Sequence, residues 1–197
     1  MKTKLIAILL ILASGASGQI SFEKGYFNDN NNQRVECLIK NADWKDNPKD
    51  FEYRLTENGI VTIGNLENIR EFGIIGESRF VRTNTNVDIS SMEISNLSKQ
   101  QEPEWEKRTL FLKVLVEGNA CLYLWSSGTF VRYFYSTSDT SIEQLVYKEY
   151  YKNNEEIASN VQFHQQLWVN LRCAGTETKT IEGLSYKKSD LVNYFRH

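Results

Sequence analysis

The stretch LFLKVLVEGNACLYLWSSGTFVRYFY, residues 110–135, decides the fold of this chain. Residues 110–117 are apolar on nearly both faces of an extended chain, which is typical of a strand inside a sheet or beneath a covering layer. Gly118-Asn119 and residues 126–128 are turn sequences, and each leads into another apolar strand. With residues 142–146 as a fourth strand, the stretch predicts an antiparallel meander.

The residues before the meander predict more strands and one short helical segment. Apolar and polar side chains alternate there in short runs that are separated by turn residues rich in Asn and Gly. Leu66, Ile69 and Phe72 recur instead at helical spacing, which predicts one or two helical turns stopped by Gly73. The predicted strands are residues 21–27, 33–40, 51–55, 61–63, 80–83 and 87–89, with a loop at 41–50.

The last third of the chain changes period. Phe163, Leu167 and Leu171 lie at i, i+4 and i+8 and predict an amphipathic helix. Ser189 is the predicted N-cap of a second helix, which still runs at His197, so we expect the natural polypeptide to continue. The fold class that follows is α+β: a mostly antiparallel β-sheet with C-terminal helices packed on it.

Residues 1–18 have the features of a cleavable secretory signal. Lys2 and Lys4 form a basic start, residues 5–13 form a short apolar run, and Ala16 and Gly18 are small residues at the cleavage positions. The apolar run is too short to span a bilayer. We therefore expect a mature chain that begins at Gln19 and is exported.

The mature chain, residues 19–197, is expected to form a single β-rich domain. Residues 90–107 are polar, contain Pro103, and predict a mobile connector within that domain. The formal net charge of the whole sequence is −2 at pH 7, and no basic stripe is present, so nucleic acid is not an expected partner.

Three cysteines follow the predicted signal, too few for a disulfide-dense scaffold. Cys121 lies inside an apolar strand and is expected to be a buried, inert thiol. Cys37 and Cys173 lie near the two ends of the domain, and the sequence leaves open whether they pair, because it cannot supply their Cα separation.

Histidine chemistry has little support in this sequence. The chain contains only His164 and His197, and no Cys, Asp or Glu lies at ligand spacing from His164, so a histidine at the surface or its boundary is expected. No G-x-S-x-G elbow is present, which argues against a serine hydrolase.

Other motifs for chemistry are also incomplete. Residues 28–32, an Asn-rich run, lack the Gly and the final Glu of a calcium loop and predict a hairpin turn. Residues 73–77 contain two glycines but no G-K-[ST], so no nucleotide is expected. The acidic pairs Glu155-Glu156 and Glu102/Glu104 fall in hydrophilic connectors, where solvated charges are expected. We predict no catalytic, cofactor-binding or metal-binding residue.

The aromatic side chains of the meander admit two interpretations. They can pack the sheet through cross-strand pairs, which we favour, or they can form a platform that binds sugars or peptides. The residues concerned are Tyr123, Trp125, Phe130, Tyr133, Phe134 and Tyr135.

The same meander resembles a secreted domain of Bacteroidota that commonly precedes a PorT-like outer-membrane β-barrel. The resemblance extends to most of the mature chain, although no barrel sequence follows here. It implies a Gram-negative cell envelope, on the periplasmic side or associated with the outer membrane. The residues that carry it are 110–118 (LFLKVLVEG), 121–123, 132–135 and 142–146, with 25–27, 36–41, 43–45, 69–74 and 184–195.

The expected function is therefore a non-enzymatic cell-envelope domain that binds a protein partner or supports an outer-membrane β-barrel. Two alternatives stay open. One is a secreted enzyme whose site is assembled from scattered Asp, Glu, Tyr or Ser residues, and the other is a carbohydrate- or peptide-binding module that uses the aromatic strands.

Overall fold

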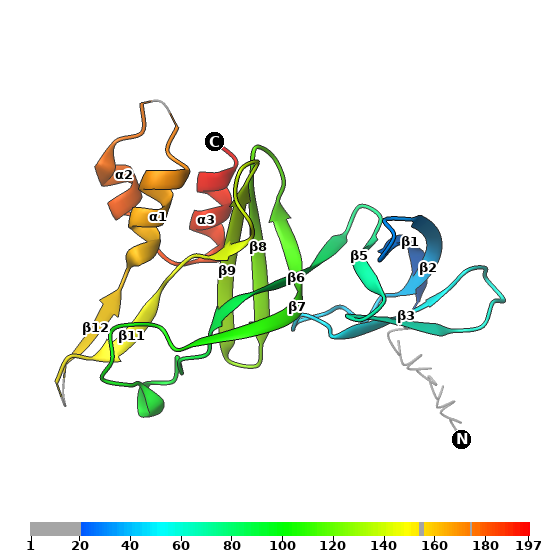
Figure 1. Ribbon diagram of the computed structural model, residues 1–197, viewed down its shortest axis with the longest axis horizontal. Coiled ribbons are helices and arrows are strands. Elements are labelled where there is room, and N and C mark those ends of the chain that lie inside the picture. The colour runs from blue at the N-terminus through cyan, green and yellow to red at the C-terminus, as the bar shows by residue number, and fades with distance from the viewer. Residues whose placement is uncertain (1–20, 154–155, 174) are drawn as a thin grey trace, which may run out of the picture.

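A computed structural model describes residues 21–153, 156–173 and 175–197 (Figure 1). The predicted signal at residues 1–18 lies outside this part of the chain. Ten of the described strands form one antiparallel sheet in the order β10-β9-β8-β7-β6-β5-β1-β2-β3-β4, and β11 pairs with β12 in a separate hairpin. Three α-helices follow the described strands, so the predicted α+β class is confirmed.

The elements of the described chain follow one another in this order. The strands are β1 (Phe22–Asp29), β2 (Arg34–Lys40), β3 (Asp50–Arg54), β4 (Thr62–Asn65), β5 (Ile69–Ile74), β6 (Ser78–Asp88), β7 (Trp105–Val116), β8 (Ala120–Ser127), β9 (Phe130–Thr137), β10 (Glu143–Gln144), β11 (Lys148–Tyr151) and β12 (Ile157–Asn160). The helices are a 3₁₀ turn (Ile94–Asn96), α1 (Gln162–Asn170), α2 (Thr178–Glu182) and α3 (Lys188–Phe195).

The predicted helical segment near residue 69 is wrong, because these residues form strand β5. Opposite β5 in strand β1, Asn28 pairs with Glu71 and Asp29 pairs with Ile69, which leaves Arg70 as an extra residue. Such a bulge shifts the alternation of side chains by one position. Ile69 and Phe72 are therefore both buried although they are three residues apart, a spacing that imitates a helix.

The two short strands predicted at 80–83 and 87–89 are one strand, β6. Its polar middle, Asn84 and Asn86, still pairs with Thr109 and Lys107 of β7. The predicted connector at 90–107 is correspondingly shorter, because β7 already begins at Trp105. Both misassignments arise where two polar strand segments pair with each other and no apolar alternation marks them.

The predicted meander β7-β8-β9-β10 is confirmed, and side chains are buried on both faces of its strands. In β9, Tyr133 and Tyr135 face the helices, whereas Phe134 between them packs with Val87 of β6 on the opposite face. Two buried faces explain why these strands are apolar at successive positions.

The helices cover one face of the meander, as Figure 1 shows. Phe163 and Leu167 of α1 are buried there, as the helical spacing predicts. Tyr186, between α2 and α3, ties the helices to the sheet, because its hydroxyl donates to the Leu145 carbonyl at 2.8 Å and accepts from the Tyr133 N–H at 2.9 Å. None of the helices in the described ranges is long and apolar enough to cross a bilayer.

The details of the last helices differ from the prediction. Lys187, not Ser189, is the N-cap of α3, and the Ser189 hydroxyl donates to Asp190 instead of capping the backbone. Helix α3 ends at Phe195, two residues before His197. Helix α2 was not predicted, because in its five residues only Ile181 is apolar and no period can be recognised.

The first half of the sheet has its own core, in which aromatic rings stack. Phe72 lies between Phe51 and Phe80, with ring centroids 3.9 and 4.9 Å away. The loop before β3 ties this half to the meander, because the Asn47 side-chain amide donates at 2.8 Å to the carbonyls of Phe111 and Leu124. The long strands β6 and β7 also connect the two halves (Figure 1).

Candidate functional site

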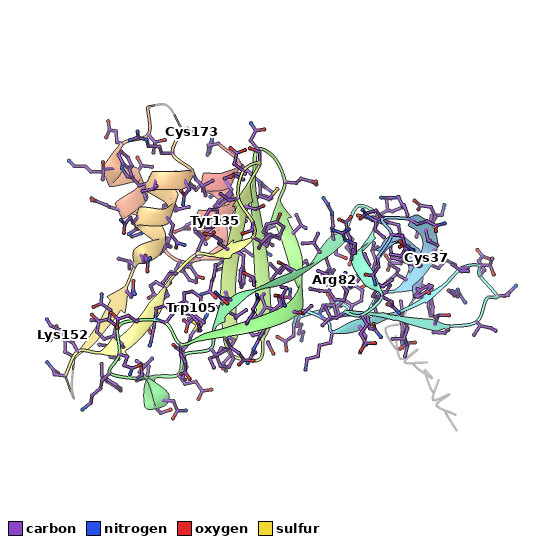
Figure 2. All side chains as sticks on the ribbon, viewed as in Figure 1. Cys37, Arg82, Trp105, Tyr135, Lys152 and Cys173 are labelled. Carbon is purple, nitrogen blue, oxygen red and sulfur yellow. The ribbon has the colours of Figure 1, made fainter. Side chains whose placement is uncertain are left out.

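The cysteines do not pair with one another. Cys37 is buried in the first half of the sheet, whereas Cys173 is exposed beyond α1, and Figure 2 shows them far apart. Burial raises the pKa of the Cys37 thiol to about 11, so it stays protonated and inert at neutral pH. Cys121 is half-buried, whereas the apolar strand around it predicted a buried thiol. Its Sγ lies 3.6 Å from the Gly118 carbonyl oxygen.

The meander aromatics pack the interior. Phe130 is half-buried, and the other five side chains are at least nine-tenths buried, so these residues do not present an exposed platform. They are Tyr123, Trp125, Phe130, Tyr133, Phe134 and Tyr135. Sheet packing, the favoured interpretation of their spacing, is confirmed.

The two glycine- or asparagine-rich motifs are turns. Asp29 accepts hydrogen bonds from the N–H groups of Asn31 and Gln33, which closes the predicted hairpin turn between β1 and β2. Gly76 joins β5 to β6 with φ of 81°, a left-handed conformation that glycine adopts without strain. Among the described residues no group of three His, Cys, Asp or Glu side chains is placed to hold a metal ion.

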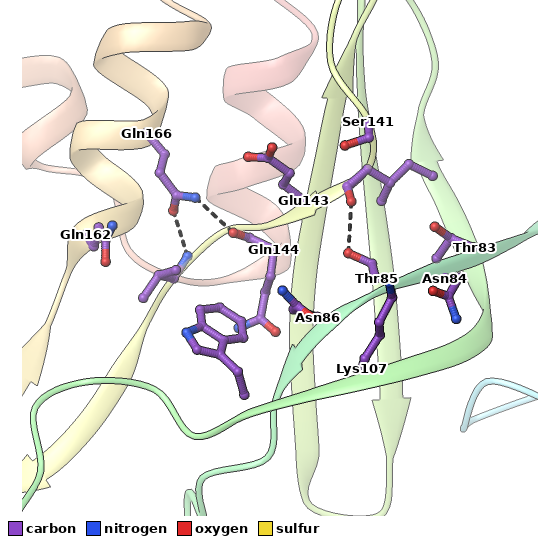
Figure 3. Close-up of a pocket in the computed structure, with 13 residues that line it drawn as sticks. Thr83, Asn84, Thr85, Asn86, Lys107, Ser141, Glu143, Gln144, Gln162 and Gln166 are labelled. Carbon is purple, nitrogen blue, oxygen red and sulfur yellow. Dashed lines mark hydrogen bonds between the residues drawn. The ribbon is translucent and has the colours of Figure 1, made fainter.

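A polar groove of about 440 Å³ lies where β6 faces β10 and α1 (Figure 3). Strand β6 pairs with β5 only as far as Val81, so its later residues have one edge without a partner among the described strands. The sheet curls until β10 approaches that edge. The Thr85 hydroxyl donates to the Ile142 carbonyl, and the Asp88 N–H donates to Gln144 Oε1, each at 2.9 Å.

Helix α1 supports the wall of the groove through Gln166. Its Oε1 accepts from the Val146 N–H at 2.8 Å, and its Nε2 donates to the Gln144 carbonyl at 2.9 Å. Both groups of this amide are therefore used to hold β10 in place, as the dashed lines in Figure 3 show.

Gln144 differs from Gln166 because only half of its amide is used. The side chain is 4% exposed, its Oε1 accepts from Asp88, and its Nε2 has no hydrogen-bond partner among the described residues. The acceptor bond to a backbone N–H fixes which end is oxygen, so the free end is an N–H donor. An unsatisfied buried donor costs about 1–3 kcal/mol.

A buried ion pair adjoins Gln144, because Asp88, one of its two members, donates its backbone N–H to Gln144. Arg132 of β9 and Asp88 of β6 are 1% and 0% exposed in their side chains, with Nη2 and Oδ2 3.3 Å apart. Arg132 also donates to the carbonyls of Asp88 and Ser90, while Asp88 Oδ1 accepts from the N–H groups of Ser90 and Glu104. Burial lowers the pKa of Arg132, and the charge of Asp88 opposes that change.

The other residues that line the groove with Gln144 also present mainly neutral polar groups. Asn86 and Gln162 expose amides, and Trp105, which is 47% exposed, adds an indole. Lys107 and Glu143 are its only charged lining residues within the described chain, and their charges are opposite. The groove can therefore form hydrogen bonds and stacking contacts, but it does not bring two acids together.

A second feature is the outer edge of β4, the last strand of the sheet. Four large apolar side chains are exposed on it and on the turn before it: Leu55, Ile60, Val61 and Ile63, at 62%, 89%, 46% and 59%. We call these four residues the β4 edge. Residues 58–65 contain no charged side chain. Proteins usually protect such edges with charges or proline, because an unpaired strand can pair with another chain.

The comparisons add no relative. No known protein family, curated protein or solved structure matches this chain. The resemblance to the Bacteroidota envelope domain therefore depends on the sequence features alone.

Sequence reasoning did not identify the groove. Gln144 and Asn86 are far apart along the chain and come together only because the sheet curls. Trp105 falls within the connector predicted at residues 90–107, although it begins β7. The one local signal is the polar run at residues 83–86, which is unusual within a strand and marks an edge or a ribbon exposed to solvent.

His164 lies at the boundary predicted for it. It is half-buried on α1, and its Nε2 is 2.9 Å from the Leu184 carbonyl oxygen. We expect His164→Ala to lower the free energy of unfolding by about 1 kcal/mol or less, the cost of one hydrogen bond. Chemical denaturation measures this change. A loss of binding function in a folded His164→Ala variant would contradict a purely structural role.

Proposed function

We propose that this chain is a non-enzymatic domain of the cell envelope, exported by its predicted signal, that binds a protein partner through the β4 edge. The single observation that carries the proposal is the apolar outer edge of β4, which has no strand partner among the described residues. An extended segment of another protein can add to such an edge through backbone hydrogen bonds, while its side chains contact the exposed apolar residues.

The arrangement of apolar residues supports this proposal. Other exposed apolar side chains, such as Ile75 and Val169, come from separate parts of the chain, and scattered apolar residues of this kind are normal on a folded protein. The β4 edge instead groups four of them at one end of the sheet. Apolar groups gathered in this way on a surface typically mark an interaction site.

The resemblance to the Bacteroidota domain supports the choice of partner. In that family the domain precedes an outer-membrane β-barrel, so a barrel or a protein associated with it is the proposed occupant of the edge. The polar groove supports the non-enzymatic part of the proposal, because Glu143 is the single carboxylate that the described residues contribute to its lining.

Photo-crosslinking in the native cells tests the proposal. A benzophenone amino acid at Ile60 should give one discrete adduct in the envelope fraction. The same probe at Val169, which is 67% exposed and far from the β4 edge, should not give that adduct. Adding Ile63→Lys to the Ile60 probe should weaken the adduct severalfold, because a lysine on an edge strand opposes strand addition.

Three outcomes would contradict the proposal. The first is an Ile60 probe without any adduct, and the second is the same adduct from Val169. The third is an adduct with a second copy of this chain, which would show that the edge pairs with itself. Mass spectrometry of the adduct distinguishes a second copy from a different protein.

A further inference from the structure

The polar groove between β6 and β10 carries an inference that is independent of the β4 edge. Its most informative group is Gln144 Nε2, a buried donor without an acceptor among the described residues. Figure 3 shows the Gln144 side chain in the groove close to Asn86. A ligand that places a carbonyl oxygen there would satisfy the donor, and an amide carbonyl is a strong acceptor for this purpose.

The remaining lining indicates an uncharged ligand with many hydroxyl or amide groups. Asn86 and Gln162 can each donate and accept hydrogen bonds, and the indole of Trp105 offers a flat apolar face. Lys107 and Glu143 leave no net charge in the lining, so neither an anion nor a cation is selected.

A peptide and a saccharide both have these groups, and the hydrogen bonds between β6 and the β10 region distinguish the two ligands. An extended peptide would bind by pairing with the free edge of β6. The bonds from Thr85 to Ile142 and from Asp88 to Gln144 already bridge that edge to β10, and an added strand would have to break both. A saccharide needs no backbone edge, because it forms its hydrogen bonds with side chains.

We propose that this groove binds a neutral saccharide that carries N-acetyl groups. The acetamido carbonyl accepts from Gln144 Nε2, the hydroxyl groups bond with Asn86 and Gln162, and the apolar face of a sugar ring stacks on Trp105. The site is distinct from the β4 edge, so the chain has one surface for a protein partner and one for a glycan.

Titration of the purified domain with defined trisaccharides tests the proposal, with calorimetry or ligand-observed NMR as the readout. The probe is the β-linked trimer of N-acetylglucosamine. Cellotriose is the matched control, because it has the same ring skeleton with hydroxyls in place of the acetamido groups. We expect the acetylated trimer to bind at least about tenfold more tightly than cellotriose, since a buried hydrogen bond is lost with the acetamido carbonyl.

Two variants connect binding to the groove. Trp105→Ala, at a half-exposed position, should weaken binding of the acetylated trimer about tenfold by removing the stacking surface. Val169→Ala, at an exposed position of α1 outside the groove lining, should leave binding of the acetylated trimer unchanged. Thermal melts of both variants confirm that each is folded.

The result that overturns the proposal is specific. No binding of the acetylated trimer at millimolar concentration, or equal binding of cellotriose, removes the N-acetyl saccharide as ligand. Binding of an alanine tripeptide that is lost in Trp105→Ala would assign the groove to a peptide instead. None of these results affects the crosslinking test of the β4 edge.

Discussion

Leu167→Asp should lower the free energy of unfolding by about 3 kcal/mol or more, because it places an unpaired carboxylate in an apolar core. Leu167 is 0% exposed on α1, and it belongs to the cluster that joins the helices to β8 and β9, with Leu122 and Leu191 among its members. Urea denaturation followed by circular dichroism measures the change.

Val169→Asp is the matched control for this prediction. It introduces the same charge on the same helix, two residues further along, where the side chain is 67% exposed. Its free energy of unfolding should stay within about 0.5 kcal/mol of the wild type. Equal effects of the two substitutions would show that the buried face of α1 does not anchor the final third of the chain.

Arg132→Met should lower the free energy of unfolding by about 3–5 kcal/mol, because it leaves a buried charge without its partner. Asp88 is 0% exposed, and Arg132 Nη2 is the cation that lies 3.3 Å from its Oδ2. The substitution also leaves the carbonyls of Asp88 and Ser90 without the donors that Arg132 supplies.

Two controls separate the buried pair from a general effect of losing an arginine. Arg70→Met removes an exposed guanidinium and should change the free energy of unfolding by less than about 0.5 kcal/mol. Adding Asp88→Asn to Arg132→Met removes the uncompensated charge and should restore part of the loss. A double variant that is less stable than Arg132→Met would show that the pair is not the reason for the effect.

The buried pair also connects the stability of the domain with its groove. Asp88 is held by Arg132 on one side and donates its backbone N–H to Gln144 on the other. Gln144 is in turn joined to α1 through Gln166. The groove is thus built from groups that the fold itself requires, and the bond from the Asp88 N–H to Oε1 keeps the amide of Gln144 in one orientation.

Predictions from the sequence were successful where one period persisted over several residues. The alternation around Cys37 and Ile39 predicted the first hairpin, and the spacing of Phe163 and Leu167 predicted α1. They failed where a bulge changed the phase, as at Arg70, or where an element was as short as α2. In both cases the local pattern had too few residues to distinguish a strand from a helix or a helix from a loop.

The candidate surfaces could be predicted to different degrees. The uncharged run at residues 58–65 is visible in the sequence, but only the strand order shows that β4 is the last described strand of the sheet and that no other described strand pairs with its outer edge. The groove could not be predicted, because its residues come from β6, β7, β10 and α1.

The sequence alone determined that this chain is a mainly antiparallel sheet with helices at its end. The spacing of apolar residues and the positions of turn residues specify strands and helices within a few neighbouring residues. The tertiary structure alone decided that the sheet curls until β10 meets β6, that Arg132 pairs with Asp88, and that Gln144 Nε2 has no acceptor within the described part of the chain. These arrangements depend on twist and packing summed over ten strands, which no short stretch of sequence contains.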